Sequence, residues 1–110
     1  MTRTLVGLLL GLCLAACSGG ARARRPDGID VSHYPAPIQT AYDVFAFRCS
    51  RCHTLARPLN AQVSDVRHWD DYVRRMRRQP GSGITRANAR EILKFLYYYT
   101  AERARAEGGT

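Results

Sequence analysis

The sequence lacks a hydrophobic run long enough to cross a membrane. Its apolar N-terminal stretch, Leu5 to Ala16, has 12 residues, whereas a bilayer span needs about 20. No stretch alternates apolar and polar residues as a half-buried strand does, so a β-sheet is not expected. A second cysteine pair and an H-x₃₋₅-H cluster are also missing, which excludes a four-ligand zinc site on Cys49 and Cys52. Lysine is nearly absent: Lys94 stands alone among 17 basic residues.

The apolar stretch instead has the length of the central region of a secretory signal, with Arg3 before it. Its end, Leu14-Ala15-Ala16-Cys17, resembles the lipobox of bacterial lipoproteins, in which a branched apolar residue and two small ones precede a cysteine. The resemblance implies cleavage before Cys17 and a lipid on Cys17 that anchors the chain to a membrane. Ser18, where an inner-membrane lipoprotein usually has Asp, favours the outer membrane. An ordinary signal peptide with a chance cysteine is the alternative.

The signal sets the expected organisation of the chain. We expect a signal peptide over residues 1–16, a lipid-anchored flexible tether over 17–39, a domain over 40–105 and a disordered tail over 106–110. Glycines, prolines and arginines make the tether polar and interrupt any helical period. Export to the bacterial cell envelope, facing the periplasm, excludes nucleic acid as the partner of this basic chain (net charge +8).

The domain is predicted to be all-α. Three helices are expected, over residues 40–52, 64–78 and 86–105. Thr40, Ser64 and Thr85 are the predicted N-caps, and Pro80-Gly81 ends the second helix. Three short helices provide a thin core, and a domain below about 70–80 residues usually needs a disulfide, a metal or a cofactor to hold it.

Cys49-Ser50-Arg51-Cys52-His53 has the pattern C-x-x-C-H, the attachment signature of c-type haem. On a helical turn the two thiols are neighbours, so both can bond the vinyl groups of one haem as thioethers, and His53 follows as the ligand of the iron. Cys49 and Cys52 are also the cysteines that remain once the signal and the lipid site are set aside, and an oxidising compartment would not keep them reduced. A thioredoxin-like dithiol needs a βαβ context, which the sequence lacks.

The residues around this motif resemble those of small c-type cytochromes. Phe45 and Ala41 lie four and eight residues before Cys49, where cytochromes of the mitochondrial class have an aromatic and a small residue. Residues 69–99 are similar to short mono-haem domains related to the reaction-centre cytochrome of green sulfur bacteria. The shared pattern is W-x-x-x-V-x-x-M, then P-G-S-G-I-[ST], then an apolar helix: Trp69, Val73, Met76, residues 80–85 and residues 93–96. The resemblance implies a three-helix cytochrome c domain packed around one covalently attached haem.

The sixth ligand of the iron, opposite His53, is predicted to be Met76. It is the only methionine left after the signal, and the family pattern places it there. Four residues of the second helix share one apolar face: Val66, Trp69, Val73 and Met76. Cytochromes of the mitochondrial class carry their methionine on an extended loop instead. His68, His33 and a vacant or water-bound position are the alternatives.

Further residues are expected in the haem pocket. Phe45 would pack between the helices and the haem, and Pro58 would shape the loop after His53, whose second ring N–H usually donates to a backbone carbonyl. Trp69 packs on the macrocycle edge or bonds a propionate, or is a plain core aromatic. A propionate pairs with Arg57 or with an arginine of residues 74–78, unless that cluster is simply a solvated helix end.

These features predict a carrier of single electrons rather than an enzyme. The expected partners are other redox proteins as donor and acceptor, and a membrane through the lipid on Cys17, with no small-molecule substrate. His/Met ligation suits electron transfer, whereas an open sixth position would suit a haem-based gas sensor or a peroxidase-like protein. A structural subunit whose haem serves mainly for folding is a further alternative.

Because the predicted core is thin, we expect the chain without haem to be mostly unfolded. Circular dichroism of haem-free protein during heating should therefore show no cooperative transition. A sharp thermal transition in that preparation would contradict the expectation.

Overall fold

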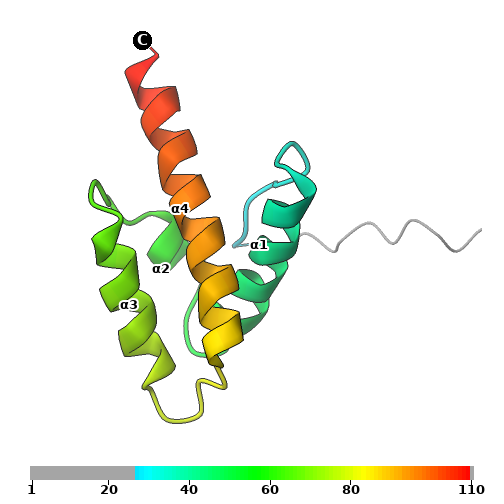
Figure 1. Cartoon of the computed structure of the whole chain (residues 1–110), viewed down its shortest axis with the longest axis vertical. Coiled ribbons are helices and arrows are strands. Elements are labelled where there is room, and N and C mark those ends of the chain that lie inside the picture. Colours follow the sequence, from blue (N-terminus) through cyan, green and yellow to red (C-terminus); the bar gives the residue numbers. More distant parts are fainter. Residues whose placement is uncertain (1–26, 110) are drawn as a thin grey trace, which may run out of the picture.

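The computed structural model describes residues 27–109. Four helices and no strand lie in this part of the chain, which confirms the all-α class. The helices, drawn in Figure 1, are α1 (Ala36–Cys49), α2 (Ala56–Leu59), α3 (Arg67–Arg77) and α4 (Arg86–Gly108). Over the described range, none is both long and apolar enough to pass through a membrane. The predicted signal peptide and Cys17 lie outside the described residues.

The long helix α4 holds the other parts together. It packs against both α1 and α3, which lie on either side of it in Figure 1. The two outer helices themselves have no Cα atoms within 8 Å of each other. The backbones of α1 and α3 are therefore positioned relative to each other mainly through their shared packing on α4.

The crossing of α1 over α4 has the composition expected from the sequence. Ala41 and Phe45 are both fully buried, as is Phe95 on α4. The Phe45 and Phe95 rings lie 4.7 Å apart between centroids, and Tyr42 lies edge-on to Phe95 at 5.1 Å. The small side chain at position 41 lets the two backbones approach, and the aromatic rings fill the remaining volume.

The first helix begins and ends earlier than predicted. It starts at Ala36 after Pro35 as N-cap, with Pro37 in its first turn, and it ends at Cys49. Proline suits a first turn because its missing N–H has no partner there. Thr40 is not a cap: it lies inside α1 and its hydroxyl donates to the Ala36 carbonyl at 3.2 Å. The predicted range 40–52 is therefore wrong by about one turn at both ends.

The packed part of the chain also begins before residue 40. Val31 and Tyr34 are buried, and the Tyr34 ring lies edge-on to Tyr98 on α4 at 4.8 Å. The backbone N–H of Leu55 donates to the Asp27 carboxylate at 2.7 Å. The boundary at residue 40 is therefore too late, because apolar side chains in the proline- and glycine-rich segment bind it to the core.

The other predicted N-caps have different outcomes. Ser64 does not cap a helix: α3 starts at Arg67 with Val66 as N-cap, and the Asp65 carboxylate accepts a hydrogen bond from the Arg67 N–H at 2.9 Å. Thr85 is the N-cap of α4, as predicted. Its hydroxyl accepts from the Asn88 N–H at 3.0 Å, and the Asn88 side chain accepts from the Thr85 N–H at 3.1 Å.

The C-terminal ends of the last two helices differ from expectation by one to three residues, whereas α4 starts at Arg86 as predicted. α3 ends at Arg77, just before the predicted stop, and Gly81 and Gly83 in the following turn have positive φ (74° and 64°). A left-handed backbone favours glycine at both positions. α4 continues to Gly108, so residues 106–108, predicted as disordered, are helical.

Replacing Ala41 by Leu should weaken the domain. The added side chain must fit where the helix backbones are closest, and overpacking of this kind costs about 1–3 kcal/mol. Chemical denaturation followed by circular dichroism, on protein made in a host that attaches c-type haem, measures the change. Ala101→Leu on the exposed side of α4 is the matched control and should leave the free energy of unfolding nearly unchanged. An equal loss of stability in both variants would show that the crossing of α1 and α4 is not especially sensitive to side-chain size.

Candidate functional site

The C-x-x-C-H motif lies at the end of α1. Cys49 is the last residue of the helix and is buried, whereas Cys52 is exposed, and both thiols are free. Burial raises the pKa of the Cys49 thiol to about 12. Cysteines that attack disulfides instead have lowered pKa values, which make the thiolate available near neutral pH. The buried Cys49 thiol is therefore not activated as a nucleophile near neutral pH.

The His53 ring is oriented by the backbone. Its Nδ1 lies 3.0 Å from the Thr54 carbonyl oxygen. A carbonyl oxygen only accepts, so this contact requires the proton on Nδ1 and leaves the lone pair on Nε2. Pro58 is buried in α2, and its carbonyl oxygen accepts from the Ala61 N–H at 3.2 Å, not from His53. In the neutral ring, this contact therefore leaves Nε2 able to bind a metal.

The apolar face of α3 is shorter than the sequence indicates. Trp69 and Val73 are buried, and Met76 is half-buried against the core. Val66 does not belong to this face, because it is the N-cap residue and 48 % exposed. Of the predicted sixth ligands, Met76 is thus the one that packs against the core of the domain.

The two rival histidines lie at the surface. His68 is exposed on α3, with its ring stacked near Tyr72 at 6.2 Å between centroids. His33 is exposed ahead of α1 and lies edge-on to Tyr34 at 4.5 Å. Each ring contacts an aromatic neighbour from outside the core.

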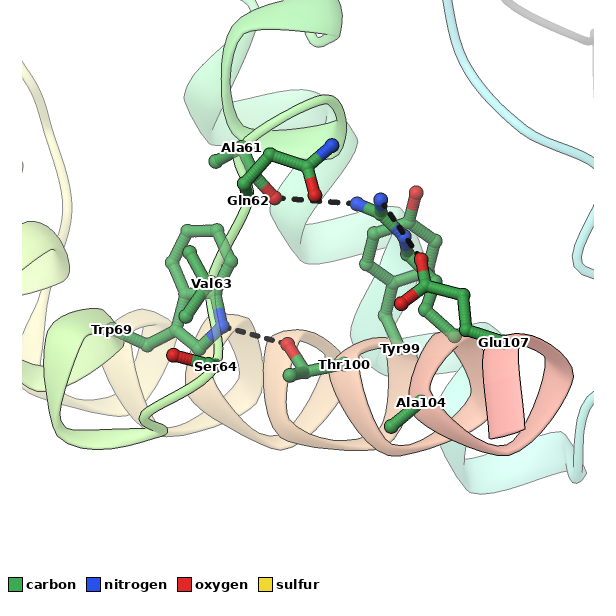
Figure 2. A pocket seen from close by; sticks show the side chains of 10 residues that line it. Ala61, Gln62, Val63, Ser64, Trp69, Tyr99, Thr100, Ala104 and Glu107 are labelled. Carbon is green, nitrogen blue, oxygen red and sulfur yellow. Dashed lines mark hydrogen bonds and ion pairs between the residues drawn. The ribbon is translucent and has the colours of Figure 1, made fainter.

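The indole of Trp69 already has a hydrogen-bond partner in the protein. Figure 2 shows its Nε1–H donating to the Thr100 hydroxyl oxygen at 2.8 Å, and that hydroxyl donates to the Leu96 carbonyl at 2.8 Å. The indole is 1 % exposed. Trp69 is thus a core aromatic whose N–H is satisfied within the chain, and packing on the edge of a haem stays a prediction.

A cavity of about 330 Å³ lies beside this indole, between residues 61–64 and the C-terminal half of α4 (Figure 2). The Arg103 guanidinium at its wall donates to the Leu59 and Ala61 carbonyls, both at 3.2 Å, and pairs with Glu107 at 3.6 Å. Of the residues predicted to hold the haem, this cavity includes Trp69 alone. Its polar groups fasten the 59–61 backbone to α4, so the cavity is not the site of the C-x-x-C-H motif.

Tyr72 is a residue of the site that sequence reasoning missed. Its ring, on α3, lies 5.6 Å from Trp69 between centroids, and its hydroxyl oxygen is buried with no hydrogen-bond partner. Burial raises the pKa of this hydroxyl, with a further contribution from Cys49, whereas the nearby Arg57 and Arg75 lower it. The hydroxyl is therefore within electrostatic reach of the α1 motif. No signal in the sequence separates Tyr72 from the other tyrosines.

These residues fit a haem better than a metal held by side chains alone. Between residues 27 and 109, no three His, Cys, Asp or Glu side chains are grouped to hold a metal ion. A haem iron needs only axial ligands from the protein, and His53 Nε2 and the Met76 sulfur have the right chemistry. The Tyr72 hydroxyl, which is buried without a hydrogen-bond partner, is a second observation that favours a bound group. A buried donor without a partner costs about 1–3 kcal/mol unless another group binds it.

The chain matches no protein-family model, no curated protein and no solved structure. The similarity to small c-type cytochromes consequently rests on the residues of the chain itself.

Replacing Thr100 by Val should lower the free energy of unfolding by about 1–3 kcal/mol, because the buried Trp69 N–H loses its acceptor. Denaturation of the haem-loaded protein measures this loss. Thr40→Val is the matched control: both threonine hydroxyls donate to the carbonyl four residues back, but only that of Thr100 also accepts from an indole. A loss no larger than that of the control would show that the Trp69–Thr100 bond contributes little.

Proposed function

We propose that this chain is a mono-haem c-type cytochrome that passes single electrons between redox proteins outside the cytoplasm. The observation that carries the proposal is the motif at the end of α1, in which Cys49 and Cys52 are free and the His53 tautomer leaves Nε2 able to bind iron. When bound, the haem supplies a one-electron couple between ferric and ferrous iron. The protein makes and breaks no bond in a substrate.

Each residue of the proposed site has a separate task. Cys49 and Cys52 form the thioethers that make the attachment permanent. His53 binds the iron on one side, with its ring direction fixed by the Thr54 carbonyl. Met76 offers a soft thioether on the other side, and its half-buried position against the core limits the access of water. Such a ligand raises the reduction potential relative to a second histidine.

The surface around the motif suits a partner with acidic groups. Arginines gather at the C-terminal ends of α1 and α3 and at the start of α4: Arg48, Arg51, Arg74, Arg75, Arg77, Arg78, Arg86 and Arg90. Cys52 is exposed at the same end of α1. Long-range attraction between opposite charges speeds the encounter of two redox proteins and weakens as salt is added. With the lipid on Cys17, the proposal places this exchange at a bacterial membrane surface.

An optical spectrum of protein from a host that attaches c-type haem tests the proposal, and Met76→Ala tests the sixth ligand. We expect a thioether-type haemochrome and a weak sulfur-to-iron charge-transfer band at the red edge, which is lost in Met76→Ala. Val73→Ala is the matched control, because it removes a buried side chain from the same face without removing sulfur. It should keep the band.

Other outcomes separate the alternatives. A covalent haem whose spectrum ignores the Met76 substitution would keep the cytochrome but remove Met76 as ligand. If the reduced protein then bound carbon monoxide without denaturant, the open-site sensor or peroxidase-like function would replace electron transfer. No covalent haem at all would overturn the proposal.

A further inference from the structure

The Tyr72 hydroxyl is an exception in the described part of the chain. Between residues 27 and 109, it is the one buried side-chain oxygen or nitrogen that has no hydrogen-bond partner. Neighbouring tyrosines show the ordinary situation: the Tyr97 hydroxyl donates to the Asp70 carboxylate at 2.5 Å, and that of Tyr99 donates to the Leu59 carbonyl at 2.8 Å. Buried polar groups in folded proteins nearly always have a partner, so the Tyr72 hydroxyl points to a group that binds there.

The charge around this hydroxyl identifies the kind of group. The Arg75 guanidinium carbon lies 5.8 Å from the centre of the Tyr72 ring, and the positive charge of Arg57 is close enough to lower the pKa of the hydroxyl. In the described residues, neither arginine forms an ion pair with a carboxylate. One O–H donor and two positive charges together suit a carboxylate.

The acidic side chains in and just before α3 are already engaged and do not supply this carboxylate: Asp65 pairs with Arg67, Asp70 with Tyr97 and Asp71 with Arg74. Cys49, where we propose the haem to be attached, is close enough to the hydroxyl to affect its pKa. A haem carries two propionates, so the nearest source of a carboxylate is the haem itself.

We propose that Tyr72 is a positioning residue for the haem, and that its hydroxyl donates a hydrogen bond to one propionate while Arg57 and Arg75 balance the charge. This inference rests on the proposed function. A propionate held in this way places less uncompensated negative charge near the iron. Ferric iron is then stabilised less, and the reduction potential is higher.

Tyr72→Phe in the haem-loaded protein tests the inference. We expect the variant to keep the covalent haem and its optical spectrum but to have a lower reduction potential, equivalent to a roughly three- to tenfold shift toward the ferric form at a fixed applied potential. Tyr97→Phe is the matched control, because it also removes a tyrosine hydroxyl between α3 and α4 but one that is bound to Asp70. Its potential should stay that of the unaltered protein.

Two further readouts distinguish positioning from general stability. Arg75→Gln should lower the reduction potential as well. In the double variant with Tyr72→Phe, the shift in potential should differ from the sum of the two single shifts, because both residues act on one carboxylate. The infrared difference spectrum between oxidised and reduced protein should show a carboxylate band that shifts in Tyr72→Phe and not in Tyr97→Phe.

An unchanged potential in Tyr72→Phe, or an equal shift in Tyr97→Phe, would overturn the role of Tyr72 and leave the cytochrome intact. Absence of covalent haem from the unaltered protein would instead refute the proposed function. The two failures are therefore distinguishable.

Discussion

The close contact of α1 with α4 is the constraint on which the remainder of the domain depends. Ala41 has the small side chain that this approach requires, and Phe45 and Phe95 fill the space beside it. Because α1 and α3 each pack against α4 and their backbones do not approach each other, the contacts with α4 strongly influence how far the C-x-x-C-H motif lies from the face of α3 that carries Met76. A shift of either outer helix along α4 would change that distance, so the packing of a few apolar side chains sets the geometry of the proposed site.

Much of the fold could be predicted from local patterns, and the errors have a common cause. The N-cap at Thr85 was predicted correctly, because the hydrogen bonds that define it join residues only three positions apart. The start of the packed segment depends on contacts that sequence periodicity does not reveal: Val31 and Tyr34 are buried, and Tyr34 lies edge-on to Tyr98 on α4. Glycine and proline indicate an irregular backbone, but they do not indicate whether that backbone is packed.

The residues of the candidate site also divide into those that a local sequence pattern reveals and those that it does not. Cys49, Cys52 and His53 could be singled out from their identity and spacing, and the structure places all three at or just after the end of α1. Tyr72 could not be singled out, because neither its identity nor its spacing distinguishes it from the other tyrosines; it stands out only through burial without a partner. Trp69 was ambiguous until Thr100, thirty-one positions later, was seen to accept its hydrogen bond.

The bond between the Leu55 N–H and the Asp27 carboxylate holds Asp27, the first described residue, against the segment after the motif. Leu55 lies two residues after His53, so Asp27 is held next to the proposed iron ligand. Only ten positions separate Cys17 from Asp27, and even a fully extended chain of that length spans no more than about 36 Å. If Cys17 carries the lipid, the domain is tethered by the side that carries the proposed haem-attachment motif. Its partners would then have to meet it within a thin layer above the bilayer, which favours other membrane-bound proteins over freely diffusing ones.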